Sequence, residues 1–510
     1  MDTFLSIFDS VLLGGSVAFT FSNVLYCAIG VLVGMVVGVL PGIGSMAAMS
    51  LLFPITFHID VTGGLIMLAG IYYGASYGGS TAAILLKLPG STASVVTCLD
   101  GYPMAQQGRA GVALFMTTIA SFVGGSIGIV LMMLFSPLIV SFAAQFGDAE
   151  FFAMMVLGLV AASTISPDSR LKALSMVVLG IGFGLVGTDL YSGVGRFTFD
   201  QLRLAEGFGL VAVAMGLFGV PEVISSIRSA KEKGAGPARV SLRSMLPAKD
   251  DWMRSWPAIF RGTGLGAFFG TLPGTGGTVA SFMSYATERQ LSKEPSRFGK
   301  GAIEGVAGPE AANNAADQTS FIPTMTLGIP GSVTMAIILG ALLTHGIPPG
   351  PRLMTNHPDI FWGLVMSFWL GNLLLLILNL PLIGVWVRIL TIPYKYLFPA
   401  ILVFVCLGVY SINHTVSDII VVIGFGALGY GMRILKFPAA PMLLGFVLGP
   451  MMEEHFRRAM LLSRGSVMTF IERPISLVFL LATIAVVALG MTSAYRQSRL
   501  RRRAEAGGNV

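Results

Sequence analysis

Leu40-Pro41-Gly42-Ile43-Gly44 recurs 232 residues later as Leu272-Pro273-Gly274-Thr275-Gly276, and this repetition decides the predicted architecture. Each copy is followed by a second Pro-Gly break, at Leu88-Pro89-Gly90-Ser91 and at Ile329-Pro330-Gly331-Ser332, and these second breaks lie 241 residues apart. Breaks at matching places in two halves of an apolar chain are a sequence pointer to the binding site of a secondary transporter. The sequence therefore predicts a duplicated unit.

The composition indicates the environment of the chain. Its 510 residues are 54% hydrophobic and 11% charged, with a mean hydropathy of +0.80, whereas soluble domains carry about 25% charged residues. Apolar runs recur along the sequence, and at about 20 residues per span they predict about 10–12 crossings plus shorter half-helices. The expected fold class is all-α, a polytopic transmembrane protein with Pro-Gly-broken helices.

The positions of the basic residues predict the orientation. No Lys or Arg precedes Lys87, whereas Lys and Arg cluster in 225–256, in 289–300 and in the tail at 491–510. By the positive-inside rule these three segments are cytoplasmic, and so is the C-terminus. The predicted domains are a first transmembrane half (1–224), a cytoplasmic linker (225–256), a second transmembrane half (257–490) and the basic tail (491–510).

Each first break is expected at the tip of a re-entrant hairpin. The segment 257–288 begins and ends beside cytoplasmic charge, while 22–57 has no basic flank and is expected to open to the outside. Broken helices at 70–92 and 303–332 complete the two copies, which would then be inverted repeats. If instead each hairpin arm crosses the membrane fully, the repeats are parallel.

A helix break inside a membrane frees backbone groups that must face protein or water. A new helix N-terminus can hold an anion, while freed carbonyls can hold a cation. The candidate substrate-binding residues are Gly90, Ser91, Thr92, Gly331, Ser332, Lys87 and Ser80. The candidate cation-binding residues are Gly42, Gly44, Ser45, Gly274, Gly276, Asn313 and Asn314. The competing interpretation is Pro kinks whose backbone groups are satisfied by Ser and Thr.

Three charged residues near the breaks each have a functional and a structural interpretation. Glu310 and Asp317 are ionisable groups among small apolar residues, where such groups are functional by default, or they cap a helix at the interface. Lys87 pairs with a substrate carboxylate or serves as a permanent cation, or its side chain snorkels to the interface.

Enzyme motifs with suitable context are missing from the sequence. Gly124-Gly125-Ser126-Ile127-Gly128 matches G-x-S-x-G, but no strand precedes it. The sequence has no H-E-x-x-H and no Walker A motif, and its three cysteines have no metal-ligand spacing. We expect no enzyme activity, no cofactor, and no metal beyond a coupling Na⁺. The remaining alternatives to a carrier are a passive anion channel and a non-transporting structural subunit.

Several blocks resemble the large membrane subunit of tripartite tricarboxylate transporters, the TctA family. The resemblance runs over nearly the whole chain. The matching blocks are LPGIGSMAAMSLLFPITF (40–57), GIYYGASYGGSTAAILLKLPGS (70–91), DGYPMAQQGRAGVAL (100–114), GTLPGTGG (270–277), FGKGAIEGVAGPEAANNAA (298–316) and LGIPGSVTMAIILGALLTHGIPPGPRLM (327–354).

The resemblance implies a multi-pass carrier of the bacterial inner membrane. It further implies two partners, a small membrane subunit of about four helices and a periplasmic solute-binding protein, and no nucleic acid. Uptake of a di- or tricarboxylate would be driven by entry of Na⁺ or H⁺. Lys87 departs from the family pattern, which usually has Asn there, and we expect this fixed cation either to replace a coupling ion or to add a substrate contact.

Overall fold

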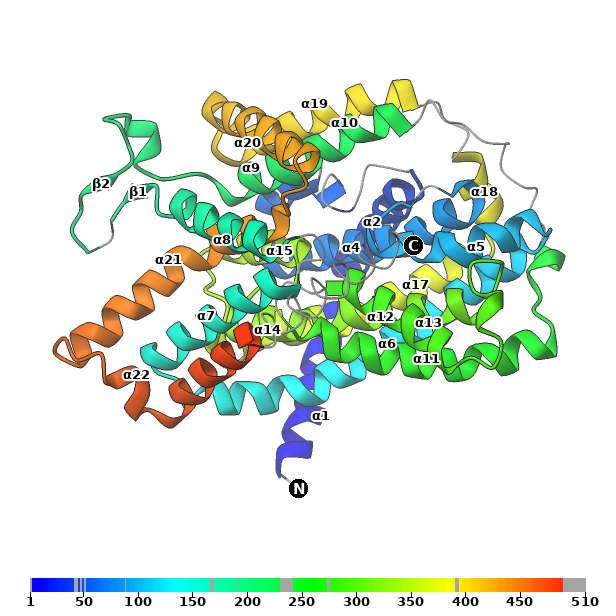
Figure 1. Ribbon diagram of the computed structural model, residues 1–510, viewed down its shortest axis with the longest axis horizontal. Helices are drawn as coiled ribbons and strands as arrows, with labels where there is room; N and C mark the ends of the chain where they lie inside the picture. The colour runs from blue at the N-terminus through cyan, green and yellow to red at the C-terminus, as the bar shows by residue number, and fades with distance from the viewer. Residues whose placement is uncertain are drawn as a thin grey trace, which may run out of the picture. The chain divides into compact units, whose positions relative to one another are not determined.

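Spatial contacts divide the chain into two compact units, whose helices are labelled in Figure 1. The computed structural model describes residues 2–40, 45, 48–49, 52–87, 89–165, 169–189, 191–229, 242–272, 276–389 and 394–488. Unit 1 comprises residues 1–144 and 208–433, and unit 2 comprises 145–207 and 434–510. Unit 1 therefore includes segments from both sides of the predicted linker. The basic tail lies outside the described residues.

Unit 1 is helical throughout its described part. Short 3-10 turns and one π turn connect or extend its helices. The helices are α1 (Asp2–Ala18), α2 (Phe21–Val39), α4 (Val61–Leu86), α5 (Thr97–Gln106), α6 (Ala110–Ala143), α9 (Leu210–Ala214), α10 (Val220–Ser229), α11 (Lys249–Gly270), α12 (Gly276–Leu291), α13 (Glu304–Thr319), α14 (Phe321–Leu327), α15 (Val333–Thr344), α16 (Pro351–Asn356), α17 (Pro358–Asn379), α18 (Ile383–Ile389), α19 (Tyr394–Asn413) and α20 (Val416–Ile434).

Unit 2 combines helices with one small β-ribbon. Its helices are α7 (Asp148–Ile165), α8 (Arg170–Gly184), α21 (Ala439–Leu462), α22 (Thr469–Glu472) and an apolar helix at Pro474–Ala488. The ribbon pairs β1 (Gly187–Thr188) with β2 (Gly195–Arg196) in antiparallel register, Gly187 opposite Arg196. Gly180 and Gly184 of α8 sit against carbonyl oxygens of Met442 and Phe446, so α8 and α21 pack through small residues.

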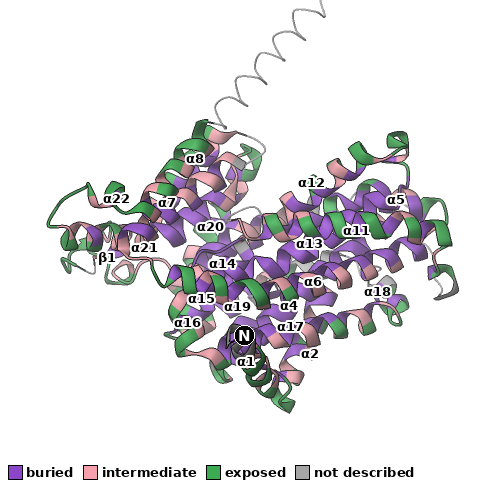
Figure 2. Cartoon of the chain, turned by 90° about the horizontal axis from the view of Figure 1, so that it is seen from below, coloured by how far each residue is buried: buried purple, intermediate pink, exposed green. Residues whose placement is uncertain are grey.

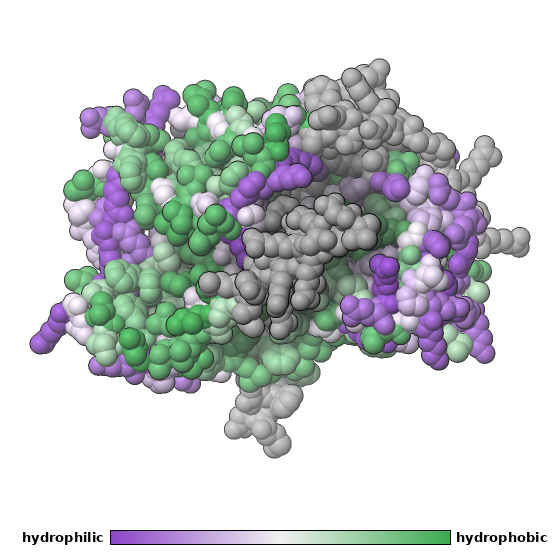
Figure 3. Space-filling view, in the orientation of Figure 1, coloured by the Kyte–Doolittle hydropathy of each residue, from purple (hydrophilic) through white to green (hydrophobic). Residues whose placement is uncertain are grey.

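The all-α polytopic prediction is confirmed. Among the described residues, four helices are long and apolar enough to cross a membrane: α2, α6, α17 and α20. Large hydrophobic side chains stay exposed on such helices, for example Phe135 and Leu138 of α6. Hydrophobic residues cover much of the face shown in Figure 3, as a lipid-facing surface requires. The expected total of crossings stays a prediction.

Helices α2 and α4 pack closely through a row of glycines on α2. A Cβ at Gly30, Gly34 or Gly38 would fall on a backbone carbonyl of α4, at Met67, Ile71 and Ala75 respectively. Residues four apart on α2 thus meet residues four apart on α4, and the two helices run parallel. Small residues let helix backbones approach closely where the hydrophobic effect gives no drive for association.

The same contact recurs between α11 and α13. Cβ atoms at Gly262, Gly266 and Gly270 would fall on the carbonyls of Gly308, Ala312 and Ala316. The three glycines of α11 follow the three glycines of α2 by 232 residues. Their contact residues on α13 follow the contact residues on α4 by 241 residues. Those displacements equal the separations of the first and the second Pro-Gly breaks in the sequence.

Helices α4 and α13 run in opposite directions, as α17 and α6 establish. Helix α17 is parallel to α4, because Gly363 lies beside Thr62 and Tyr77 bonds to Asn372. Helix α6 is antiparallel to α17, with contacts from Asn379 to Thr118 and from Asn372 to Ser126. Helix α6 is parallel to α13, because Gly124 packs on Ala311 and Gly128 on Ala315.

Helices α11 and α12 form a hairpin, and residues 273–275 between them lie outside the described part of the chain. Arg261 of α11 forms an ion pair with Glu288 of α12 toward the open end, at 2.6 Å. At the other end Gly270 and Gly277 both pack on the 313–319 part of α13. In the first copy the chain leaves α2 beside Ala75 and returns at Thr56, which packs on Gly64 near the start of α4.

The glycine contacts give a matched pair of substitutions on α11. Gly266→Ala places a Cβ on the Ala312 carbonyl, and we expect it to lower stability by about 1–3 kcal/mol because the backbones must separate. Gly264 has open space around its Cβ position, so Gly264→Ala is expected to be neutral or stabilising by up to about 1 kcal/mol. Unfolding of the purified chain in detergent measures both. Equal effects would contradict the packing described.

Candidate functional site

Polar residues of unit 1 concentrate on two helices that are buried on all sides. Helix α4 is buried from Thr62 to Leu85, and every residue of α13 is buried (Figure 2). Polar groups placed there have no bulk water to bond with, so they must satisfy one another. The sequence nevertheless puts hydroxyls, amides and two carboxylates at this depth.

The first group of polar residues is centred on Asp317. Tyr72 donates its hydroxyl to Asp317 Oδ1 at 2.5 Å, and Ser76 donates to Oδ2 at 2.7 Å. Asn313 Nδ2 donates in turn to Ser76 Oγ at 3.0 Å. We call Tyr72, Ser76, Asn313 and Asp317 the crossing cluster. Its short O–H to carboxylate bonds are of the strong, charge-assisted kind and fix α4 against α13.

The second group surrounds Glu310, two helical turns before Asp317. Thr97 of α5 donates to Glu310 Oε1 at 2.5 Å, and Ser121 of α6 lies 3.4 Å from Oε2. Asn314 donates to Ser121 Oγ at 2.8 Å. The hydroxyl of Ser80 on α4 is directed at the Glu310 carboxylate, near enough to stabilise its charge but outside the strict geometry of a hydrogen bond. We call these five residues the Glu310 cluster.

Further polar bonds connect these helices to α17 and α6. Tyr73 donates to Gln318 Oε1 at 2.8 Å, and Tyr77 donates to Asn372 Oδ1 at 2.7 Å. Asn372 Nδ2 donates to Ser126 Oγ at 3.0 Å. The serine of the G-x-S-x-G match thus accepts a structural hydrogen bond, while the flanking glycines pack on α13.

Gly276 and Ser332 are the last residues of the two breaks in the second copy, and they meet beside the crossing cluster. Gly276 begins α12 with a positive φ of 53°, and a Cβ there would lie 3.4 Å from Ser332 Cβ. A Cβ at the next residue, Gly277, would fall on Asn313 Oδ1. Ser332 caps α15, accepting from the Met335 amide at 3.3 Å, and it also faces the Tyr72 hydroxyl.

The second break of the first copy reaches the same place from the other side. Thr92 and Thr278 place their hydroxyl oxygens 2.7 Å apart, so the turn after Gly90 touches the first turn of α12. A Cβ at Gly90 would fall on the Gly38 carbonyl and near Gly79. A Cβ at Gly331 would lie near Ser320 and the Gly270 carbonyl. Ser320 follows Gly79 by 241 residues and Gly270 follows Gly38 by 232, so Gly331 repeats the contacts of Gly90.

The structure brings some predicted residues together and separates others. Gly276, Asn313 and Ser332 share one location, and Thr92 reaches it through Thr278, whereas Ser80 and Asn314 belong to the Glu310 cluster. Two candidate anion donors already have partners: the Ser91 amide donates to Ser94 Oγ, and the Gly331 amide donates to Thr324 Oγ1.

Lys87 lies apart from the crossing cluster. It is exposed at the C-terminal end of α4, with a left-handed φ of 58° and its Nζ 5.6 Å from the centre of the Tyr102 ring. Ser45 is helical and half-buried. Three candidate cation ligands, Gly42, Gly44 and Gly274, lie outside the described residues.

Sequence reasoning missed several members of the polar groups. Thr97, Ser121 and Asn372 lie on α5, α6 and α17, outside the two predicted broken helices at 70–92 and 303–332. Asn372 carried a usable signal, because an amide in the apolar run 360–390 needs a partner at membrane depth. A single Ser or Thr in a membrane helix carries no such signal, since it can bond to its own helix.

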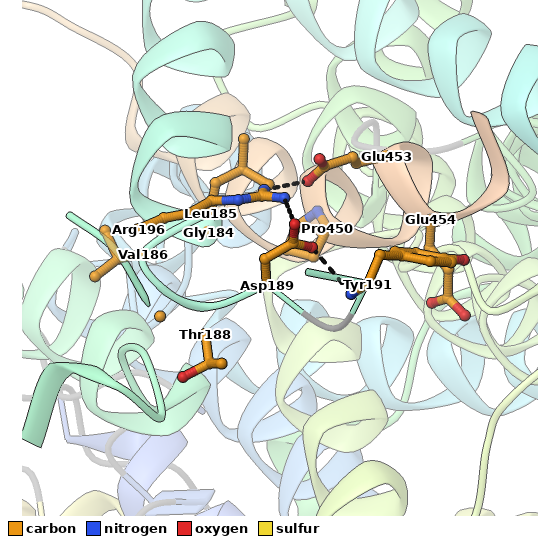
Figure 4. Close-up of a pocket in the computed structure, with 11 residues that line it drawn as sticks. Gly184, Leu185, Val186, Thr188, Asp189, Tyr191, Arg196, Pro450, Glu453 and Glu454 are labelled. Carbon is orange, nitrogen blue, oxygen red and sulfur yellow. Dashed lines mark hydrogen bonds and ion pairs between the residues drawn. The ribbon is translucent and has the colours of Figure 1, made fainter. Parts of the chain in front are cut away.

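A pocket of about 130 Å³ in unit 2 is lined by paired charges (Figure 4). Arg196 of the β-ribbon lies 2.8 Å from Asp189 and 2.7 Å from Glu453 of α21. Hydrogen bonds from the Ser192 hydroxyl, from Arg196 and from the Tyr191 amide hold the pKa of Asp189 below its usual range. These charges neutralise one another, so the pocket walls fasten the ribbon to α21.

Comparisons with known proteins identify a family and two relatives that match large parts of the chain. The model of the family described as "Tripartite tricarboxylate transporter TctA family" matches residues 24–444. An Agrobacterium vitis protein described as an uncharacterized 52.8 kDa protein in the TAR-I ttuC' 3' region is 48% identical over 495 residues, 97% of this chain and 98% of that protein. Another A. vitis protein, in the TAR-II ttuC' 3' region, is 54% identical over 234 residues, 46% of this chain and 97% of that protein. No solved structure matches the chain.

A double-mutant cycle measures the bond between Tyr72 and Asp317. Tyr72→Phe is expected to lower stability by about 1.5–3 kcal/mol, because the hydroxyl serves a charged acceptor. In an Asp317→Ala background the same change should have an effect below about 0.5 kcal/mol. Unfolding in detergent gives all four values. Tyr285, which donates to Asp100 at 2.9 Å, is the matched control: Tyr285→Phe should be additive with Asp317→Ala. Additivity of Tyr72→Phe would contradict the cluster.

Proposed function

Because this chain belongs to the tripartite tricarboxylate transporter TctA family, it is the large subunit of a transporter and not an enzyme, and we propose that it translocates organic anions by ion-driven alternating access. The proposed substrates are di- and tricarboxylates. The observation that carries the proposal is the convergence of Pro-Gly breaks on a buried, hydrogen-bonded crossing of α4 and α13.

The proposed assembly has three parts. The family name describes a tripartite system, which supports partner subunits. We propose that these are a small membrane subunit of about four helices and a periplasmic solute-binding protein that delivers the anion. The proposed location is the bacterial inner membrane with the C-terminus in the cytoplasm, on the strength of the basic segments around 225–256 and 289–300.

We propose that the two copies are inverted repeats. Two features of unit 1 support this proposal. The glycine contacts of α2 with α4 recur between α11 and α13 at the displacements of the sequence motifs. Helices α4 and α13 also run in opposite directions, as the contacts through α6 and α17 require. A pair of parallel repeats would give these two helices the same direction.

The proposed anion site lies where the turn after Gly90 meets the first turns of α12 and α15. Helix N-termini carry partial positive charge and favour anions. Hydroxyls of Thr92, Thr278 and Ser332 add donors at this place. The proposed cation ligands remain the first-break glycines with Ser45, Gly274, Gly276, Asn313 and Asn314, and Lys87 is proposed to contact a substrate carboxylate at the end of α4.

Cation entry is the proposed driving force. Moving each negative charge inward against an inside-negative potential requires about 2.3 kcal/mol per 100 mV. A dianion or trianion therefore needs accompanying cations to enter. A carboxylate at Asp317, close to the proposed anion site, adds a second reason, because it repels the substrate unless a cation offsets its charge.

Transport by reconstituted vesicles tests the function. We expect radiolabelled di- or tricarboxylates to accumulate when the large subunit, the small subunit and the solute-binding protein are all present and a Na⁺ or H⁺ gradient is imposed. Omitting the binding protein or collapsing the gradient should return uptake to background. Failure of every carboxylate in the panel to respond to either gradient would contradict the proposal.

Two N-cap serines provide a matched pair in the same assay. Ser332 caps α15, and Ser169 caps α8 of unit 2 by accepting from the Lys172 amide. Each change to Ala should lower stability by about 0.5–2 kcal/mol through the lost cap. Only Ser332→Ala is expected to raise the substrate KM, because only Ser332 lies at the proposed anion site. Equal KM values in both variants would count against that site.

A further inference from the structure

Buried acidic groups in the described part of the chain are not matched by buried basic ones. Seven acidic residues are, as whole residues, at least nine-tenths buried, and no Lys, Arg or His in the described part is buried to that extent. Five of the seven have compensating partners: Asp100 with the amides of Gly301 and Ala302, Glu150 with Arg473, Asp251 with Arg109, Glu288 with Arg261, and Glu304 with Arg254 and Arg297.

Glu310 and Asp317 are the two with neither a cationic partner nor a backbone amide donor among the described residues. Asp317 accepts a short hydroxyl hydrogen bond on each of its two oxygens. Glu310 is less completely bonded, since only Thr97 is close and Ser121 lies at 3.4 Å from Oε2. A buried carboxylate without a cation is strongly unfavourable, so Glu310 needs a positive charge from elsewhere.

An unsatisfied hydroxyl points to a ligand at Glu310. Ser80 is 3% exposed, and its Oγ is directed at the Glu310 carboxylate without reaching the strict geometry of a hydrogen bond to any described residue. Hydroxyl hydrogens rotate, so Ser80, Thr97 and Ser121 can each turn a lone pair toward a cation held by the carboxylate. Oxygen-only ligands suit hard cations, and a single carboxylate balances one positive charge.

The described groups that act directly on Glu310 carry no positive charge, although Lys87 at the end of α4 acts electrostatically on the neighbouring Cys98. Helix α4 presents Tyr77 and Ser80, α5 presents Thr97 and Cys98, α6 presents Ser121, and α13 itself presents Asn314 and Asp317. All the titratable groups in this set are neutral or negative. Four helices thus converge on an anionic, oxygen-lined position.

We propose that Glu310, with Ser80, Thr97 and Ser121, forms a binding site for one monovalent cation, either Na⁺ or a proton. As a coupling site it rests on the proposed function. The site is distinct from the ligands expected at the hairpin tips and from the crossing cluster, because Glu310 precedes Asp317 by seven residues, about 10 Å along α13. One rigid helix connects the two positions, so cation occupancy at Glu310 is sensed at the anion site.

Cation-dependent stability tests the site without requiring transport. The purified chain in detergent is melted over a range of Na⁺ at constant ionic strength, and separately over a range of pH without Na⁺. We expect a rise in Tm with one of the two cations in the wild type and loss of that rise in Glu310→Gln. The arm that responds identifies the source of the charge.

Two further variants make the result specific. Glu304→Gln removes another buried acid of α13 that already has arginine partners, and it should keep the cation-dependent rise. Ser80→Ala should keep the fold, since its hydroxyl makes no hydrogen bond in the described structure, while weakening apparent cation affinity roughly tenfold. It keeps the test decisive if Glu310→Gln does not fold.

The outcomes separate the site from the transport function. A wild-type Tm that responds to neither cation, or a response that survives in Glu310→Gln or is unchanged in Ser80→Ala, would overturn the site. In vesicles the cation dependence of uptake should disappear in Glu310→Gln and persist in Glu304→Gln. A cation response in Tm without gradient-driven uptake by the wild type would support the site and overturn the proposed function.

Discussion

Complete burial of α4 and α13 is the constraint on which the rest of unit 1 depends. Glycines on α2 and α11 let the backbones approach closely enough to bury these helices, as the contacts of Gly34 with Ile71 and Gly266 with Ala312 show. Sealed helices can hold polar side chains only if each finds a partner in a neighbouring helix. The hydroxyls of α4 and the carboxylates and amides of α13 meet that requirement in each other, which is why the bonds between them lie at one crossing.

The two clusters give the crossing different properties at its two ends. Around Asp317 the carboxylate oxygens are fully bonded, and this end holds the helices in register beside the breaks. Around Glu310 a hydroxyl is left over and the charge is uncompensated within the described residues. A carrier that moves anions needs both a fixed frame and a charge that changes with cation occupancy. The proposed mechanism assigns these tasks to separate parts of one helix.

Much of this architecture could be predicted from sequence because it depends on backbone chemistry. Pro-Gly breaks and glycine spacing locate the hairpins, and Ser332 begins a helix where the Pro-Gly-Ser pattern placed one. Side-chain partners could not be predicted in the same way. Thr97 and Ser121 acquire meaning only through the tertiary fold that brings them to Glu310. Lys87 is the reverse case. As an isolated cation in an apolar stretch it is a prominent candidate in the sequence, but in the structure it lies exposed at the end of α4, over Tyr102.

The central claim is that the two hairpins open to opposite sides of the membrane, and cysteine accessibility in intact cells tests it most directly. Phe21 at the start of α2 and Leu291 at the end of α12 are both exposed at the open ends of their hairpins. Each is changed to Cys after Cys27, Cys98 and Cys406 are replaced, and the cells are treated with a membrane-impermeant thiol reagent. The account predicts labelling at position 21 from outside and at position 291 only after permeabilisation. Labelling of both positions from the same side would contradict it.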